Sequence, residues 1–474
     1  MSTLSSNLKS RPSNEEDDPR NSSAAQSIVL KISNHRFAPE YTHQCFDNEW
    51  IPGYQPYHLN DNYHESHNYH SGCNFELEVE ITFSPSCDIC SVEINTRRKR
   101  ESMVDTRNPK KLREAHSTGE NNKQRGDVDL PVDDLENDNI IKTVPDGTPH
   151  SNDNDTAESA TITPMPPEEI KERLKRALPK ILPMIKGTKD LLENCYLEKT
   201  VGKVLKTYTR GNSHDCDKQR EFVLTVADGD NAAEYHKLVQ NIAIFFIESA
   251  DAVDFADTQS GGYWKALYLF QKHDDSKFSL CGYMTLFHFL SPFRKPLPGT
   301  VIRICQALVL PPYQREGHGK VMVHAVHEMA RNSAGEIVEI NVEDPAPSFA
   351  SLRNCVDCEL LEQSLHSPQP WIGENYLKIG EFPALLEPDA IEAASLGRIT
   401  INQLHTAYEL YKLKSLPEND PEIEKQYRLM VKRRLLKVHK EDLSGCETKE
   451  ERKILLDEIW AELFEKYKLV LKKK

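Results

Sequence analysis

The stretch Val301–Leu352 constrains the fold of this chain more than any other. An apolar segment, 301–310, leads through a glycine-containing loop into a helical pattern, and a second apolar segment, 337–342, follows. These patterns predict strand, loop, helix and strand in that order. Glu343 and Asp344 come directly after the second strand. The stretch therefore predicts a strand–loop–helix–strand unit with two carboxylates at the carboxyl end of its last strand.

The loop has the composition of a phosphate-binding turn. Gly317 and Gly319 let backbone N–H groups approach a ligand, and the following helix offers unpaired N–H donors at the positive end of its dipole. A Walker loop would need glycine in place of Gln314 and serine or threonine in place of Val321. The dinucleotide fingerprint would need a third glycine in place of Met322. The alternative to a phosphate site is a plain strand-to-helix turn.

Composition limits the classes of protein that this chain can belong to. Its 474 residues suffice for two to four domains, but 38% hydrophobic residues and a mean hydropathy of −0.61 are low for one compact globule. Part of the chain is therefore expected to be disordered. The net charge of −15 argues against a protein that coats nucleic acid and favours a basic substrate.

The chain is expected to be intracellular and free of metal. No apolar run approaches the roughly 20 residues of a membrane span, and residues 1–20 contain no signal-peptide core. The eleven cysteines are then expected to be free thiols. Two CxxC pairs, Cys87/Cys90 and Cys355/Cys358, lie far apart in the sequence, so zinc is not predicted.

Charge and periodicity divide the chain into segments. Between Asp127 and Glu158 there are ten acidic residues and one lysine, and the basic clusters from Arg97 to Arg113 look like a bipartite nuclear-import signal or, alternatively, ordinary solvated charges. The predicted organisation is a disordered tail (1–26), a first domain in two parts (27–94 and 164–240), a disordered charged insertion between them (95–163), a domain with the glycine loop (241–365) and a helical domain (389–474).

The predicted elements place the chain in the α+β class, with a mixed sheet. A hairpin of 201–208 with 220–226, a helix over 232–246 and strands over 263–271 and 280–290 precede the strand 301–310. Helices are predicted over 348–361, from a Thr400–Gln403 capping box onward, over 422–439 and over 449–471. In the third of these, Lys432, Arg433 and Arg434 are expected on the polar side.

Motifs spread along the chain are similar to those of one known family. The sequence resembles the type B histone acetyltransferase catalytic subunit, a member of the GNAT superfamily, from about residue 28 to 440, with the charged insertion interrupting the similarity. The stretches that carry the resemblance are Phe37-x-Pro-Glu-Tyr-Thr-His-Gln44, Phe246-Ile-Glu-Ser-Ala250, Gly282-Tyr-Met-Thr285, Pro312-Tyr-Gln-x-x-Gly-His-Gly319, Glu343-Asp-Pro345, Leu352-Arg353 and Tyr427-Arg-Leu-x-x-Lys-Arg-Arg-Leu435.

The resemblance implies a GNAT fold over 241–365 between an N-terminal histone-acetyltransferase domain and the C-terminal helices. It implies transfer of acetyl from acetyl-CoA to lysines of newly made histone H-four, without metal. By matching positions it assigns the pantetheine arm of acetyl-CoA to Ala307, Leu308 and Val309. It assigns the pyrophosphate to Gln314, Arg315, Glu316, Gly317, His318, Gly319 and Lys320, with Lys320 in contact with phosphate or solvent. It assigns the histone tail to Asp47, Asn48, Glu49, Phe287, His288 and Phe289.

The resemblance also implies a WD-repeat histone chaperone as partner, a location in nucleus and cytoplasm, and neither DNA nor membrane binding. Two alternatives remain at this point. One is a non-catalytic histone-escort subunit that uses the acidic insertion, and the other is a GNAT enzyme acting on a non-histone amine.

The chemistry of lysine acetylation requires a base. A lysine ammonium has a pKa of about 10.4 and must lose a proton before its nitrogen attacks a thioester. Glu343 is the predicted general base, with Glu248 and Asp344 as supporting or alternative bases, although a helix N-cap is an equally reasonable role for Asp344.

The histidines and the cysteine near the glycine loop are predicted to have structural roles. His318 and His327 are expected to be loop and helix-surface residues, and Cys305 an ordinary strand residue. Direct transfer from cofactor to amine requires neither a metal nor a nucleophilic cysteine.

Overall fold

The computed structural model describes most of the chain beyond residue 194 and parts of what precedes it. The described residues are 28–32, 35–37, 75–98, 171–172, 175–176, 192, 195–211, 219–247, 250–257, 260–274, 276–294, 298–378, 380–417 and 420–472. The predicted tail, the acidic run and the Pro39–Gln44 part of the first motif lie outside them. So does the charged insertion, except that its first four residues complete a strand that ends at Arg98.

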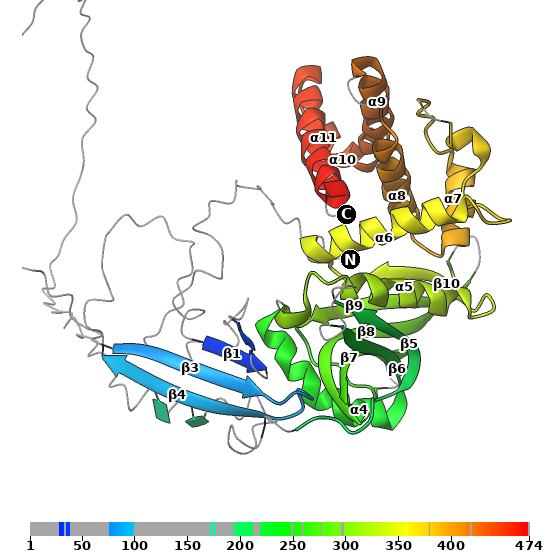
Figure 1. The fold of residues 1–474 in the computed structure, drawn as a ribbon. Coiled ribbons are helices and arrows are strands. Elements are labelled where there is room, and N and C mark those ends of the chain that lie inside the picture. Colours follow the sequence, from blue (N-terminus) through cyan, green and yellow to red (C-terminus); the bar gives the residue numbers. More distant parts are fainter. Residues whose placement is uncertain are drawn as a thin grey trace, which may run out of the picture.

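A six-stranded sheet forms the centre of the molecule (Figure 1). Its strand order is β10-β9-β8-β7-β6-β5, with only β10 parallel to its neighbour. The strands are β5 (Lys203–Arg210), β6 (Arg220–Ala227), β7 (Gly262–Asp274), β8 (Lys277–Ser291), β9 (Gly299–Val309) and β10 (Ile337–Val342). The predicted mixed sheet and α+β class are confirmed.

A smaller sheet packs beside the first. Its order is β2-β1-β3-β4, formed by β1 (Ile28–Ile32), β2 (His35–Phe37), β3 (Phe75–Phe83) and β4 (Cys90–Arg98). The turn between β3 and β4 joins the two sheets, because Leu280 of β8 donates to the Pro85 carbonyl at 2.8 Å. Phe83 also packs edge-on against Phe245, so the two sheets share one apolar core.

Helices cover both faces of the large sheet. The helix α4 (Gly229–Val239) packs through Tyr235 on Tyr268 of β7. The helix α5 (His318–Arg331) lies on the other face, where Met329 borders a hollow with Tyr263 of β7. Tyr263 and Tyr268 are five residues apart on one strand, so their side chains point to opposite faces.

The predicted helix over 232–246 is shorter in the structure. After Val239 the chain continues as a 3-10 segment, Gln240–Phe245. The Asn241 amide donates to the carbonyls of Lys237 and Leu238, both at 2.9 Å. These carbonyls would otherwise accept from the next turn of an α-helix, so the side chain competes with helix continuation.

The long helix α6 (Pro347–Ser364) separates α5 from the C-terminal helices (Figure 1). On the far side of α6, Gln403 donates to Asn354 at 2.7 Å. The remaining helices are α7 (Glu387–Gly397), α8 (Ile401–Lys414), α9 (Pro421–Val438), α10 (Lys440–Ser444) and α11 (Lys449–Lys472). They enclose a second apolar core that includes Tyr408, Tyr427 and Trp460.

Two details of these helices differ from the sequence expectation. Thr400 caps α8 by accepting from the Gln403 N–H at 3.2 Å, but the Gln403 side chain reaches α6 instead of completing the capping box. Arg434, expected on the polar side of α9, points inward and forms two hydrogen bonds to Glu409 of α8. A buried carboxylate on a neighbouring helix is the physical reason for this inward orientation.

None of the described helices is long and apolar enough to cross a membrane. Within the same residues, no group of three or more His, Cys, Asp or Glu side chains is placed to hold a metal ion. Cys87 and Cys90 are buried free thiols.

Candidate functional site

The parallel strands β9 and β10 separate halfway along β9. Their pairing ends at Val342 opposite Ile304, and the Glu343 N–H makes the last bond, to the Ile304 carbonyl at 3.0 Å. The rest of β9, 305–309, pairs with β8 alone in the part of the chain that the structure describes. Backbone groups on the open edge of β9 are therefore available to a ligand with its own amides.

Local irregularity on β8 and β9 shapes this opening. The register between them shifts at Thr285/Leu286, which leaves Cys305 without an opposite residue. Such a bulge bends the strand that contains the extra residue. Beyond the bulge Gly282 lies opposite Val309, and a Cβ on Gly282 would be 2.4 Å from the Leu308 oxygen. The lack of a side chain at Gly282 therefore allows the backbones of β8 and of the open part of β9 to approach each other closely.

The predicted glycine loop lies between β9 and α5. It begins with a 3-10 turn, Pro311–Tyr313, after which the side-chain amide of Gln314 donates back to the Val309 carbonyl at 2.9 Å. Arg315 and Gly317 have positive φ angles of 65° and 82°. Gly317 directly precedes α5, whose first-turn N–H groups have no partner within the helix. A backbone of this shape presents its donors to an anion.

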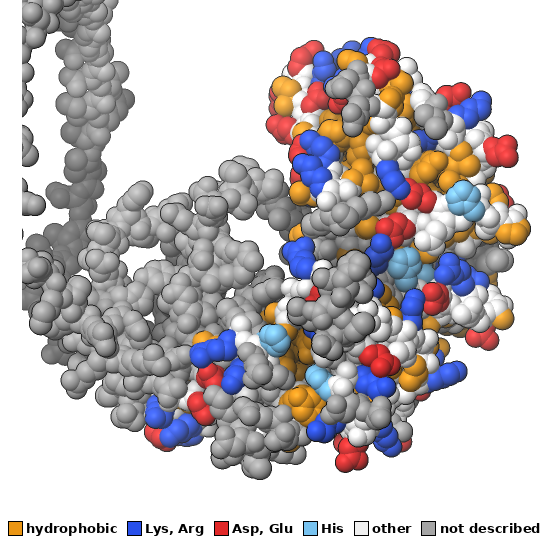
Figure 2. All heavy atoms as spheres, in the orientation of Figure 1, with side chains coloured by type: hydrophobic (Ala, Val, Ile, Leu, Met, Phe, Trp, Pro, Cys, Tyr) orange, Lys and Arg blue, Asp and Glu red, His pale blue; other side chains and the backbone are white. Residues whose placement is uncertain are grey.

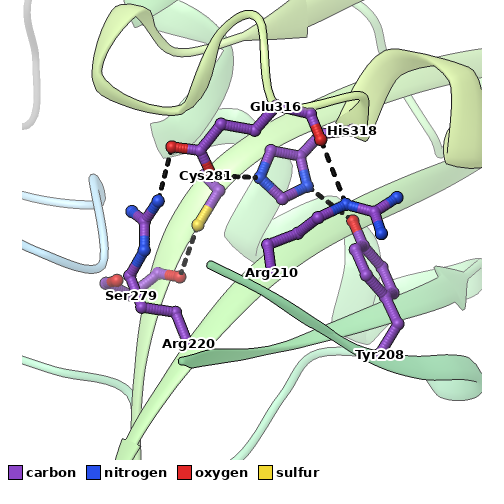
Figure 3. A network of polar contacts seen from close by, with 7 residues as sticks. All are labelled: Tyr208, Arg210, Arg220, Ser279, Cys281, Glu316 and His318. Atoms are coloured by element: carbon purple, nitrogen blue, oxygen red, sulfur yellow. Dashed lines mark hydrogen bonds and ion pairs between the residues drawn. The ribbon is translucent and has the colours of Figure 1, made fainter. Parts of the chain in front are cut away.

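A polar network beneath the loop fixes its shape (Figure 3). Tyr208 of β5 lies 2.7 Å from His318 Nδ1, and His318 Nε2 lies 3.3 Å from Glu316 Oε2. Glu316 also pairs with Arg220 of β6. Burial lowers the pKa of His318, so the ring is neutral at pH 7. A neutral ring accepts from the Tyr208 hydroxyl at Nδ1 and donates to Glu316 from Nε2.

The predictions for two histidines were wrong, since His318, expected in the loop, begins α5, and His327, expected on a helix surface, is buried. His318 is 1% exposed, because Tyr208 and Glu316 bind both of its ring nitrogens. His327 is 4% exposed and faces α6, where its Nε2 lies 3.1 Å from Asp357. Both residues therefore connect α5 to neighbouring elements.

The start of α5 is also bound to α6. Lys320 pairs with Glu359 at 2.7 Å while its side chain stays 40% exposed, so the contact with phosphate or solvent that the resemblance implies stays a prediction. A Cβ on Gly319 would lie 2.8 Å from Leu352 Cδ2. Gly319 therefore allows α6 to cross α5 closely, in addition to any role at a ligand.

The two glycines of the loop are expected to respond differently to replacement by alanine. Gly317→Ala forces a side chain into the left-handed region at a cost of about 1–2 kcal/mol and should weaken the coenzyme A binding that the resemblance implies. Gly319→Ala meets only the flexible end of Leu352, so its cost should be below about 1 kcal/mol. Urea unfolding and calorimetric titration with coenzyme A measure the two effects. The expectation is wrong when Gly319→Ala is the more damaging change.

The structure places two of the three candidate bases. Glu343 is exposed at the point where β10 leaves β9. Asp344 is exposed, with a φ of 32°, and it does not cap α6, whose N-cap is Ala346. Glu248 lies outside the described residues, but the nearby Asp251 carbonyl accepts from Gln306 of β9 at 2.7 Å. That bond brings the segment after Glu248 to the open part of β9.

The thiol of Cys305 lies beside Glu343. Burial, followed by interaction with Glu343, raises the pKa of Cys305 to about 12. A thiol with that pKa stays protonated at pH 7 and is a weak nucleophile. The chemistry available at this point of the sheet is therefore that of a carboxylate.

The predicted row Phe287–Phe289 is divided between the two faces of the sheet. Phe287 and Phe289 stack with ring centroids 5.8 Å apart, and Trp264 of β7 joins them at 4.8 Å from Phe287. His288 points to the opposite face, where it stacks on Tyr263. Strand alternation causes this division.

Trp264 was not singled out in the sequence, although its position opposite Phe287 follows from pairing the two predicted strands. Asp47, Asn48 and Glu49 lie outside the described residues.

The aromatic side chains share a face with the end of β10. Arg303 lies with its guanidinium 5.0 Å from the centre of the Phe289 ring and donates to Asn341 of β10 at 3.3 Å. Glu343 follows Asn341 by two residues and so points to the same side. The structure therefore brings Phe287, Phe289 and Glu343 to one face.

Buried neutral histidines predict a specific pH dependence. Burial lowers the pKa of His236 from 6.5 to about 3 and that of His288 from 6.5 to about 4. Since the folded pKa lies below the unfolded one, their contribution is complete above pH 6.5 and is lost as the pH falls towards 4. At pH 5 each of the two histidines should lower the free energy of unfolding by about 2 kcal/mol relative to its value above pH 6.5. NMR titration should show both rings neutral at pH 5, and a midpoint near 6.5 for either would contradict this.

Comparison with known proteins supports the resemblance. No protein-family model matches the chain. Three curated relatives are named histone acetyltransferase type B catalytic subunit. The protein from Rattus norvegicus is 30% identical over 210 residues, 44% of this chain and 46% of the relative. That from Homo sapiens is 29% identical over 210 residues, with the same coverage, and that from Mycosarcoma maydis is 29% identical over 238 residues, 49% of this chain and 50% of the relative.

The chain thus spans about half the length of the curated relatives that it matches. A solved structure, Arabidopsis thaliana NAA60 in complex with a bisubstrate analogue, is 16% identical and covers 23% of this chain and 68% of its own, with a TM-score of only 0.17. The sequence similarity is therefore the informative comparison. Over about half of its length, this chain is similar to the histone acetyltransferase type B catalytic subunits.

Proposed function

We propose that this protein transfers acetyl from acetyl-CoA to lysine side chains of a histone, with newly made histone H-four as the preferred substrate. The observation that supports this most directly is the separation of β9 from β10. One opening combines a free strand edge, a glycine loop at a helix N-terminus and an exposed glutamate. The similarity to type B histone acetyltransferase catalytic subunits supports the same activity.

The residues of the opening fit the two halves of acetyl-CoA. Ala307, Leu308 and Val309 lie on the unpaired part of β9, where outward backbone groups suit the amides of the pantetheine arm, except the Val309 carbonyl, which accepts from the Gln314 side chain. The space beside Gly317 is open in the described part of the chain, since apart from its chain neighbours only Arg210 would come within 4 Å of a Cβ there. That space adjoins the first turn of α5, where a pyrophosphate is stabilised by N–H donors and the helix dipole. The cofactor supplies the activated thioester acyl group.

Glu343 is the proposed general base. Its carboxylate takes a proton from the lysine ammonium, whose nitrogen then attacks the acetyl carbon. The carbon–sulfur bond breaks, the amide forms, and coenzyme A leaves as the thiol after taking up a proton. Asp344, next along the chain, and Glu248 are alternative bases. Cys305 remains protonated beside Glu343 and takes no part as a nucleophile.

Aromatic side chains are proposed to guide the acceptor lysine. Trp264, Phe287 and Phe289 form a row on the Glu343 side of the sheet, suited to the methylene stem of lysine and to its charge. On the face shown in Figure 2, Lys and Arg side chains are interspersed with Asp and Glu. Selection of a basic tail is therefore assigned to this local site, with Asp47, Asn48 and Glu49 as further contacts implied by the resemblance.

Reaction of the purified full-length chain with acetyl-CoA and a histone H-four tail peptide tests the proposal. Mass spectrometry should show acetyl-lysine on the tail. An unrelated lysine peptide and free spermidine serve as competing acceptors, and faster reaction with either would replace the histone with another amine. Histone binding without any affinity for acetyl-CoA in calorimetry would support a non-catalytic escort instead.

The partner and location remain part of the same proposal. A WD-repeat histone chaperone should co-purify with the tagged chain when both are expressed together. Fluorescent tagging should show the protein in both nucleus and cytoplasm, and removal of residues 99–113, which leaves β4 intact, should reduce the nuclear fraction.

A further inference from the structure

Two arginines lie opposite each other at one end of the β5–β6 hairpin. Arg210 is the last residue of β5, and its cross-strand partner Arg220 is the first residue of β6. Like charges placed directly opposite on two strands destabilise a sheet. The repulsion between the two guanidinium groups is therefore expected to be offset by a negative group next to each arginine.

Only one of the two arginines has a carboxylate partner among the described residues. Glu316 pairs with Arg220 and so neutralises it. Arg210 instead donates from Nε to the backbone oxygen of Glu316 at 3.0 Å, and its guanidinium lies 5.0 Å from the centre of the Tyr208 ring. In Figure 3 its two terminal nitrogens reach no other residue drawn. The charge of Arg210 is thus fixed in place without an anion.

The bond to Glu316 orients Arg210 towards the glycine loop. Its Nη2 lies 3.7 Å from the position that a Cβ on Gly317 would occupy, and among the described residues, chain neighbours aside, no other atom comes within 4 Å of that position. Gly317 directly precedes α5, so the guanidinium adjoins the first-turn N–H groups. A planar guanidinium with free N–H donors suits bidentate contact with phosphate oxygens.

The lysine of the loop does not supply this charge. Lys320 Nζ is 2.7 Å from Glu359, a carboxylate of α6. Arg315 belongs to the loop, but no contact with another described residue fixes its exposed side chain, whereas Arg210 is held by a hydrogen bond and a ring contact. Arg210 is therefore the cation that the structure holds beside the anion-binding end of α5.

We infer that Arg210 binds the pyrophosphate of coenzyme A, as a cofactor-binding residue contributed by a strand more than 100 residues before the loop. The inference rests on the proposed function, since coenzyme A is the ligand of that site. It extends the cofactor site from the β9–α5 loop to the β5–β6 hairpin.

Calorimetric titration of the full-length chain with coenzyme A tests this. Arg210→Gln should weaken binding on the order of ten- to a hundredfold, the usual effect of losing a hydrogen bond to a charged group. Lys206→Gln is the matched control, because it removes the same charge from an exposed position on the same strand and should change the affinity less than about twofold. Arg210→Lys, which keeps the charge but not the fork, should fall between the two.

Titration with a second ligand distinguishes the pyrophosphate of coenzyme A from its 3′-phosphate as the group that Arg210 contacts. Arg210→Gln should weaken binding of 3′-dephospho-coenzyme A by the same factor as binding of coenzyme A, because both ligands contain the pyrophosphate. Disappearance of the loss with that ligand would assign Arg210 to the 3′-phosphate and overturn the inference, as would equal coenzyme A affinity in Arg210→Gln and the unaltered chain. Failure of the unaltered chain to bind coenzyme A would instead overturn the proposed function, and the inference with it.

Discussion

Glu343→Gln is expected to reduce the rate of acetyl transfer about 10²- to 10⁴-fold, the range for loss of a general base. Glutamine keeps the size of the side chain and the backbone bond to Ile304 that ends the β9–β10 pairing. The opening between the strands should therefore persist. Affinity for acetyl-CoA, measured by calorimetry, should change little while the turnover number falls.

Asp344→Asn is the matched control for this prediction. The two residues are neighbours and both are exposed, but the positive φ of Asp344 marks a turn in the chain after β10. A larger loss of turnover in Asp344→Asn than in Glu343→Gln would transfer the role of base to Asp344. Full activity in both variants would assign it to Glu248. A pH–rate profile for each variant separates loss of the base from a change in substrate binding.

The elements around the opening could be predicted because their signals are local. The strand predicted over 337–342 has the same bounds as β10. A short apolar run that is bounded by turn residues and followed by Glu-Asp-Pro is typical of a strand. Gly317 was singled out for conformational freedom, and its φ of 82° uses that freedom. Thr400 caps α8 as its residue type indicates.

The orientation of individual side chains could not be predicted in the same way. His318 stands between two glycines of the predicted loop and Arg434 follows two other basic residues, so burial was expected for neither. Each is buried because its partner comes from elsewhere, Tyr208 at 110 residues' separation and Glu409 at 25. A single sequence gives no register between such distant segments.

The same limit applies to the candidate site. The hairpin β5–β6 was predicted as a hairpin, but nothing in its sequence placed Arg210 and Arg220 beneath the glycine loop. Likewise, Phe287, His288 and Phe289 were assigned together by family resemblance, although strand alternation alone separates the middle residue from the other two. Combining the resemblance with the strand prediction would have revealed that separation.

Glu409→Gln is expected to destabilise the C-terminal helices by about 3–5 kcal/mol, the usual cost of breaking a buried ion pair. The side chain of Glu409, on α8, is 4% exposed. It accepts from Arg434 of α9 at 2.6 and 2.8 Å and from the Tyr467 hydroxyl of α11 at 2.8 Å. One carboxylate thus joins three helices, and its loss leaves a buried guanidinium without a counter-charge.

Two controls separate this effect from a general loss of charge. Glu362→Gln makes the same change in the more exposed pair with Lys414 and should cost less than about 1 kcal/mol in urea unfolding. Glu409→Gln combined with Arg434→Met removes both charges, so it should recover much of the stability lost in the single variant. No recovery would mean that Tyr467 and packing dominate. Recovery would show that Arg434, in the Lys-Arg-Arg stretch that resembles the acetyltransferase family, serves to assemble the C-terminal helices. The proposed acetyl-transfer chemistry would then depend on the opening between β9 and β10.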